Sequence, residues 1–226
     1  MTLDEALAAF ALPPQARLDR RVPKKQLLES GAPTAADKRA ITDGIEELIW
    51  VAPLKPTNVG VPEYKDDDRH YIEIAVLTLT FRPGARADRL RELVHRAIPY
   101  PVVLMSTDDT GVVLSLAHLR HAQNEAGKVV VDGELLAAAI PAGSWSQRLA
   151  FHRQPTADLH ALYNAWYRWL QPLVKLAQMD GEVADLRHRA EREPQLNRRV
   201  ELNLDMQRRL VERNRLAADI QASGAA

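Results

Sequence analysis

The sequence predicts an α+β fold, in which a mixed sheet with flanking helices is followed by a C-terminal helical hairpin or coiled-coil arm. Three observations lead to this prediction. Helical and β-type apolar patterns follow one another up to about residue 155, a long run of β-branched and aromatic residues occupies 71–81, and apolar residues recur at spacings of three and four from residue 159 onwards. We therefore expect an α+β domain over residues 1–155 and a helical arm over residues 156–226.

Composition limits the class of protein. The chain has 226 residues, of which 46% are apolar, and its 30 basic side chains equal its 30 acidic ones in number, so bulk basicity gives no argument for nucleic acid. The absence of cysteine excludes disulfides, thiol nucleophiles and zinc fingers, and it agrees with a reducing compartment. The longest strongly apolar run is far shorter than the roughly 20 residues of a membrane helix, and the acidic N-terminus lacks the pattern of a signal peptide. We expect a cytoplasmic protein with no membrane partner.

The chain is predicted to begin with a short helix, because Thr2 and Glu5 have the spacing of a capping box ahead of an apolar face. Residues 15–39 are predicted to be irregular, and they carry seven Lys or Arg against three acids. Near the end of this stretch Thr34 follows a proline and caps a predicted helix over residues 35–47, whose apolar side chains recur at helical spacing.

Residues 48–131 are predicted to form the sheet. A helix over 88–98 interrupts the β-type pattern, because its leucines and its valine recur at spacings of three and four. The acidic cluster at 65–69 is expected to be a solvated hairpin tip rather than a metal site, since consecutive side chains of an extended chain point to opposite sides. The short runs of β-branched and aromatic residues predict strands at 48–52, 71–81, 101–105, 112–116 and 128–131.

The C-terminal arm begins with the strongest helical stripe of the chain. Trp166 and Trp169 lie on this stripe among leucines, which favours core positions over base stacking, and Pro172 inside it predicts a kink or a break. The stretch 182–220 is helix-rich and polar, with a turn expected near Glu193. Two long helices joined there could pair as an antiparallel hairpin or join the helices of a partner as a coiled coil.

Six segments of the sequence, taken together in their order and spacing, carry a family resemblance. They are VPKK at 22–25, ADKR at 36–39, IWVAPLKPTNV at 49–59, IEIAVL at 72–77, RAIPYPVVL at 96–104 and EPQLNRRVELN at 193–203. With these segments the chain resembles the bacterial family known as domain of unknown function 4391. It departs from the family pattern after the strand at 112–116, where Ala117-His118-Leu119-Arg120 stands in place of a Tyr-Lys pair. Any role of that lysine would therefore fall to Arg120.

The resemblance implies a function, because the family looks like small accessory proteins encoded near helicases and DNA methyltransferases in restriction-like, anti-phage gene clusters. It implies a non-enzymatic accessory subunit that binds a helicase or a DNA methyltransferase subunit. The last resembling segment is polar for a core, so we expect it to be the partner-binding surface, and a homodimer through the C-terminal helices stays open. The side chains concerned are Gln195, Asn197, Arg198, Arg199, Glu201 and Asn203.

A first alternative is a DNA-binding module. The N-terminal segment has a local surplus of basic residues, and such a cluster can hold the phosphates of a nucleic acid, or an acidic partner, by charge. The residues that would do this are Lys24, Lys25, Lys38 and Arg39.

A second alternative is a divergent metal-dependent nuclease, whose site needs two acids and a lysine around a divalent metal. Glu46, Glu47 and Glu73 could converge, with Lys25 or Lys38 as the cation.

Two features of the strand at 71–81 weaken that alternative. Ala75 stands two residues after Glu73, at the position where a nuclease site would carry its lysine. Strand alternation also predicts that Glu73 faces solvent while Ile72, Ile74 and Val76 face the core.

No cofactor, metal site or catalytic residue is assigned. The ten glycines are scattered singly, so the chain lacks a glycine-rich phosphate loop. His118 and His121 follow a strand, and His152 and His160 flank the expected domain boundary, without the carboxylates and repeated spacing of a zinc site.

Overall fold

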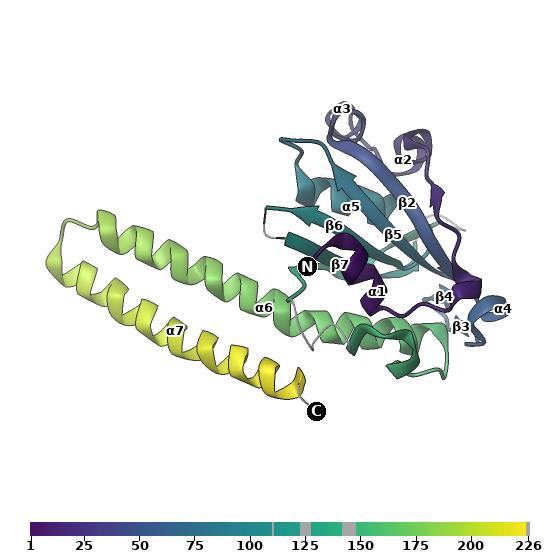
Figure 1. The fold of residues 1–226 in the computed structure, drawn as a ribbon. Helices are drawn as coiled ribbons and strands as arrows, with labels where there is room; N and C mark the ends of the chain where they lie inside the picture. Colours follow the sequence, from purple (N-terminus) through teal and green to yellow (C-terminus); the bar gives the residue numbers. More distant parts are fainter. Residues whose placement is uncertain (110, 123–127, 142–147, 225–226) are drawn as a thin grey trace. The chain divides into compact units, whose positions relative to one another are not determined.

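The computed structural model describes residues 1–109, 111–122, 128–141 and 148–224 (Figure 1). The chain divides into two compact units, Met1–Leu170 and Gln171–Ala226. The first unit holds the sheet, and the second consists of the greater part of helix α6 (Leu159–Arg192) and all of helix α7 (Leu196–Gly224). Within the described residues no helix is both long and apolar enough to cross a membrane.

A six-stranded mixed sheet forms the centre of the first unit. All neighbouring strands are antiparallel except β5 and β6, which are parallel and are joined by helix α5 (Ala87–Ala97), because parallel neighbours need a crossover connection. The α+β prediction is therefore confirmed. In sheet order the strands are β1 (Arg20–Arg21), β2 (Ile45–Leu54), β5 (Ile74–Phe81), β6 (Val102–Asp108), β7 (Gly111–His121) and β8 (Val129–Ala139).

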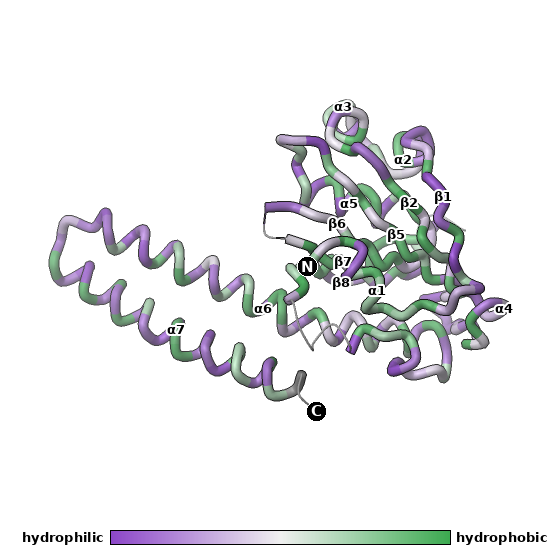
Figure 2. Tube along the Cα trace, in the orientation of Figure 1, coloured by the Kyte–Doolittle hydropathy of each residue, from purple (hydrophilic) through white to green (hydrophobic). Residues whose placement is uncertain are grey.

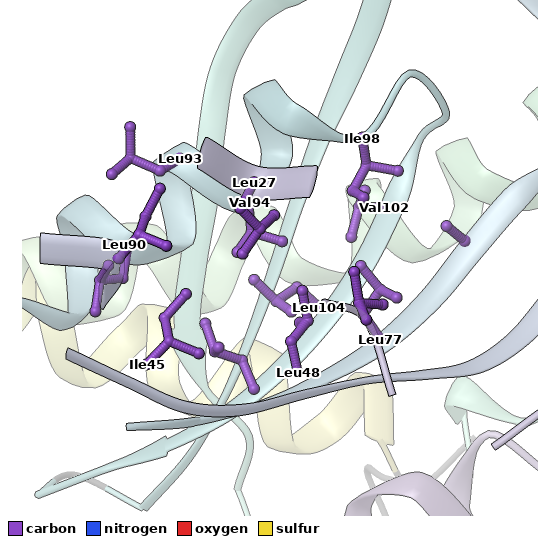
Figure 3. Close-up of a cluster of buried hydrophobic side chains, with 14 residues drawn as sticks. Leu27, Ile45, Leu48, Leu77, Leu90, Leu93, Val94, Ile98, Val102 and Leu104 are labelled. Carbon is purple, nitrogen blue, oxygen red and sulfur yellow. The ribbon is translucent and has the colours of Figure 1, made fainter. Parts of the chain in front are cut away.

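One face of the sheet packs against three helices, α2 (Lys24–Ser30), α3 (Ala35–Gly44) and α5. Figure 3 shows the apolar cluster between them, to which α2 contributes Leu27, β2 contributes Leu48 and β6 contributes Leu104. The amphipathic pattern of α5 was visible in the sequence, and Leu90, Leu93, Val94 and Ile98 are all buried in this cluster.

The other face of the sheet packs against α1 (Leu3–Ala9) and the first turns of α6. Phe10, at the end of α1, contacts the ring of Trp166 edge to face at a centroid distance of 5.3 Å. The Trp166 indole donates a hydrogen bond to the Leu149 carbonyl at 2.9 Å, so this tryptophan is a core residue, as predicted. Its burial also places the start of α6 in the first unit.

Small elements complete the first unit. The predicted capping box is present, since Thr2 Oγ1 accepts the Glu5 N–H and the Glu5 carboxylate accepts the Thr2 N–H. The acidic cluster forms a hairpin tip, as predicted, where Asp66 accepts the N–H groups of Asp68 and Arg69. The remaining short elements are η1 (Pro14–Ala16), α4 (Pro56–Val59), β3 (Tyr64–Lys65), β4 (His70–Tyr71) and η3 (Phe151–Arg153).

Two local predictions are wrong near the first strand pair. The helix expected over 35–47 ends at Gly44, because Ile45 already pairs with Phe81 as the first residue of β2. Either a helix or a strand would bury the same apolar residues in this segment, so the apolar pattern alone could not distinguish the two structures. The segment 15–39, predicted to be irregular, contains α2, which buries Leu27.

The orientation predicted for Glu73 is also wrong. Glu73 precedes β5 and is only 4% exposed, whereas Ile72 is 39% exposed. The Lys55 ammonium lies 3.0 Å from Oε2 of Glu73 and compensates the buried carboxylate. Residues 72 and 73 lie between β4 and β5, so the alternation expected for a strand does not hold there, and the ion pair makes the burial of Glu73 possible.

The second unit is an antiparallel helical hairpin, one of the two arrangements predicted for the arm. Glu182 and Asp180 of α6 form ion pairs with Arg209 and Arg213 of α7 at 3.1 and 2.8 Å. The turn between the helices lies where it was expected, after Arg192. Helix α6 continues through Pro172, so the predicted interruption does not end the helix there.

Two glycines offer a matched test of the packing. A Cβ atom built on Gly31, after α2, would lie 2.7 Å from the Leu93 carbonyl oxygen of α5, whereas a Cβ on Gly181 in α6 meets nothing within 4 Å. We predict that Gly31→Ala destabilises the protein by about 1–3 kcal/mol through overpacking. Gly181→Ala should instead stabilise α6 by about 1 kcal/mol, because alanine is the better helix former. Urea unfolding followed by circular dichroism measures both, and an unchanged midpoint for Gly31→Ala would contradict the close approach.

Candidate functional site

The four predicted phosphate-binding residues lie on α2 and α3. Lys25, Lys38 and Arg39 are exposed, and Lys25 faces Glu29 at 3.8 Å across one helical turn. Lys24 is half-buried and donates to the Thr42 carbonyl at 2.8 Å, which joins the start of α2 to the end of α3.

Two arginines lie close to Lys24, and the carboxylate of Asp43 partly offsets their charge. Burial, and then the neighbouring guanidinium groups of Arg82 and Arg21, lower the pKa of Lys24. Arg82 was not singled out from the sequence, because it lies more than 50 positions from Lys24 along the chain. A cation held beside like charges favours an anionic ligand, whose charge would relieve the repulsion.

The three glutamates of the nuclease alternative do not converge. In the β2–β5 ladder Glu47 pairs with Thr80 near one end, while Glu73 precedes Ile74 at the other. Strand geometry separates the two ends by roughly 20 Å. The described part of the chain contains no group of three or more His, Asp or Glu residues placed to hold a metal ion.

A cavity of about 450 Å³ lies beside Glu73, at the edge of the sheet formed by β1 and β2. Its walls include Val22, Trp50, Glu73 and Tyr100, together with Lys55. These residues come from four of the six segments on which the family resemblance depends, and those segments are dispersed over more than 80 positions of the chain. The fold thus collects most of the resembling segments around one hollow.

A second cluster, made of histidine and tyrosine rings, was not predicted, although His118 and His160 were noted individually in the sequence. Tyr71 of β4, His118 of β7 and His160 of α6 contact one another, with centroid distances of 6.2 Å for Tyr71–His118 and 5.4 Å for His118–His160. The Tyr71 hydroxyl lies 2.8 Å from Nδ1 of His118 and accepts the Leu119 N–H at 3.3 Å. Since the rings come from three distant elements, the cluster fastens the β3–β4 hairpin to β7 and α6.

Burial sets the protonation of these histidines. It lowers the pKa of His118 to about 4, with a further contribution from His160, and it also lowers the pKa of His160. His95 of α5 is fully enclosed, with Nε2 at 3.0 Å from Ser115 Oγ, and burial lowers its pKa to about 3. All three rings are therefore neutral near pH 7.

Arg120, the residue that stands where the family pattern predicts a lysine, is part of an ion-pair group beside this cluster. Its Nε lies 3.6 Å from Asp132, and the same carboxylate accepts a hydrogen bond from Arg69. The Arg69 guanidinium therefore holds the β3–β4 hairpin against β8, and that of Arg120 links β7 to β8.

The six predicted partner-binding residues lie in the second unit. Gln195 precedes α7, and the other five are on its first turns. All six side chains are exposed, as a binding surface requires: Gln195, Asn197, Arg198, Arg199, Glu201 and Asn203.

An exposed apolar stripe runs along α7 beside these residues. Leu196, Val200, Leu204 and Val211 are 63, 49, 53 and 69% exposed. At 100° per residue they fall within an arc of about 80°, on the side of the helix away from Arg213 and its contact with α6. Figure 2 shows the resulting alternation of hydrophobic and hydrophilic residues along α7.

The fold and these surfaces define an α+β protein with a mixed sheet and a helical hairpin arm. The chain belongs to the family described as Domain of unknown function (DUF4391), whose model matches residues 10–175. The match covers the sheet, the cavity and the start of α6, and it ends before the resembling segment at 193–203. No curated protein and no solved structure matches the chain.

The buried histidines predict how stability depends on pH. Unfolding exposes His95 and His118 and restores a pKa near 6.5, so below about pH 6.5 the unfolded chain binds protons that the folded chain does not. We therefore predict that the melting temperature falls between pH 7 and pH 5, and that His118→Gln reduces this slope. His121→Gln removes an exposed histidine of the same strand and should keep the wild-type slope. Equal slopes for His118→Gln and the wild type would show that His118 is not held neutral.

Proposed function

We propose that the protein is an accessory subunit of a bacterial DNA-processing or anti-phage complex. It acts by binding a larger protein, a helicase or a DNA methyltransferase subunit, through the exposed apolar stripe of α7. The class of partner comes from the resemblance, and the surface comes from the geometry of α7.

The observation that carries this proposal is the exposure of Leu196, Val200, Leu204 and Val211 on one side of the helix. An isolated exposed leucine is ordinary, but three exposed apolar side chains on successive turns, with a fourth two turns further on and polar side chains around them, are typical of a protein-binding surface. The rim consists of the amides and charges predicted to contact a partner, among them Asn197, Glu201 and Asn203. Helix-in-groove recognition uses apolar anchors at such spacings.

Paired substitutions test the stripe. The full chain is co-expressed in turn with the helicase and DNA methyltransferase subunits of its host, and affinities are compared for Val200→Gln/Leu204→Gln and the wild type. Each lost apolar contact is worth about 1.5–3 kcal/mol, so the affinity should fall at least about tenfold. Glutamine keeps the helix propensity, so α7 itself should stay folded.

The matched control is Ile72→Gln/Val130→Gln, which removes two exposed apolar side chains from the first unit and should bind like the wild type. Full partner affinity in the α7 variant would contradict the proposal. If sedimentation shows a wild-type dimer that the α7 variant dissociates, the stripe binds a second copy of the chain instead.

A DNA-binding function is the second candidate, and the concentration of charge around Lys24 favours it. We predict that replacing Lys24, Lys25, Lys38 and Arg39 by Gln weakens DNA binding and flattens its salt dependence by about one unit of logarithmic slope per lost contact. The control replaces four exposed basic residues elsewhere: Arg148, Arg153, Arg168 and Lys175. Equal slopes for the two variants would assign any binding to total charge, and no binding at low salt would exclude this candidate.

A further inference from the structure

The cavity at the β1–β2 edge combines two kinds of wall. One wall is aromatic, with Trp50 of β2 and Tyr100 of the α5–β6 connection at a ring-centroid distance of 6.5 Å and an interplanar angle of 65°. The other is charged and contains Arg20, Arg21 and Lys55 together with Glu73. A hollow of about 450 Å³ is large enough for a small organic ligand.

The aromatic wall is not explained by packing alone. Trp50 is half-buried, and its indole Nε1 is shielded from solvent without a hydrogen-bond partner among the described residues. Buried polar atoms are nearly always paired, so a purely structural position would favour an apolar ring without the N–H. A tryptophan beside a tyrosine at the rim of a hollow instead suits a flat ring that stacks on one of them and meets the other edge to face.

The charged wall has a surplus of cations. Glu73 is already paired with Lys55 at 3.0 Å, and Arg21 lies 3.8 Å from Glu47. Arg20 is exposed and forms no ion pair with any residue that the structure describes. The cavity therefore has guanidinium donors to spare, and guanidinium groups bind the oxygens of a phosphate in pairs.

The buried Glu73 fixes the position of the Lys55 ammonium in this wall. Its carboxylate, 4% exposed, holds the Lys55 ammonium beside the hollow, although the Lys55 side chain is itself half-exposed. A lysine fixed in this way is a preset point charge for an anion and loses little freedom on binding. The ion pair thus joins a carboxylate buried inside the cavity to a cation at its exposed rim.

We propose that this cavity binds a single nucleotide, with the base against Trp50 and Tyr100 and the phosphate held by Arg20 and Lys55. Stacking is tolerant of base identity, so the site selects for a phosphorylated base rather than for a sequence. The same chemistry is presented by a free mononucleotide and by the phosphorylated end of a single strand. The site lies in the first unit and does not involve the stripe on α7, so either proposal can fail without the other.

The test is calorimetric titration of the full-length protein with AMP, CMP, inorganic phosphate, and a single-stranded octanucleotide with and without a 5′-phosphate. We expect binding with a Kd below about 1 mM for a mononucleotide or for the phosphorylated strand. Arg20→Gln should weaken it about tenfold, as the loss of one charge-assisted contact implies. The control Arg153→Gln, outside the cavity, removes the same charge and should bind like the wild type.

The outcomes separate the sources and the alternatives. Mononucleotides that bind as tightly as the phosphorylated strand identify a free nucleotide as the ligand, and a strand that binds tighter only with its 5′-phosphate identifies a strand end. Tyr100→Leu must weaken either ligand, and it provides the aromatic test if Trp50→Leu does not fold. Inorganic phosphate that binds as tightly as AMP, or no binding of any probe at 1 mM, would overturn the proposal.

Discussion

The buried hydroxyl of Tyr163 is the contact on which the arrangement of the first unit depends. It lies 2.8 Å from the Val102 carbonyl oxygen and 2.9 Å from that of Ala117, and it accepts the Ala117 N–H at 2.9 Å. Ala117 sits at an irregularity in the β7–β8 register, between Leu116 and His118, so its backbone groups are displaced from the regular ladder. Tyr163 satisfies both groups from α6, and burial, its largest cause, raises the pKa of its hydroxyl well above the usual value. The start of α6 is therefore part of the sheet's own hydrogen bonding.

The sequence predicted local features well where neighbouring residues decide them. The Thr2–Glu5 capping box, the hairpin tip at Asp66 and the antiparallel pairing of α6 and α7 all follow from spacings of a few residues or from a single turn. The wrong predictions concern features that are determined by residues distant in the sequence. Ile45 is a strand residue because β5 pairs with it, and Glu73 is buried because Lys55 lies beside it. The apolar periodicity of a single segment gives no information about either of these contacts between distant residues.

The candidate sites divide in the same way. The group at Lys24 could be predicted because its members are close in sequence, but Arg82 and Arg21, which raise its local charge, come from other elements. The cavity and the histidine–tyrosine cluster could not be predicted, since each is assembled from strands and helices that meet only in the fold. Four of the six resembling segments were the one signal for the cavity, because a resemblance dispersed along the chain can still describe a single place in space.

The net charge of zero does not show that some basic side chains form ion pairs within the fold while others do not. Arg91 is 2% exposed on its side chain and pairs with Asp88 and Asp108, and Arg89 pairs with Asp37, so these cations hold the fold and are not free to bind a ligand. The Arg89 contact is strong enough to lower the pKa of Asp37 to about 2. Arg20 has no such partner among the described residues, and Lys24 lies beside other cations. Binding of an anion depends on this local surplus rather than on the total charge, because the Debye length is about 8 Å at physiological salt and screens charges elsewhere on the molecule. The edge of the sheet at β1 therefore has a cation that is not used in an ion pair of the described residues, although the sequence as a whole is neutral.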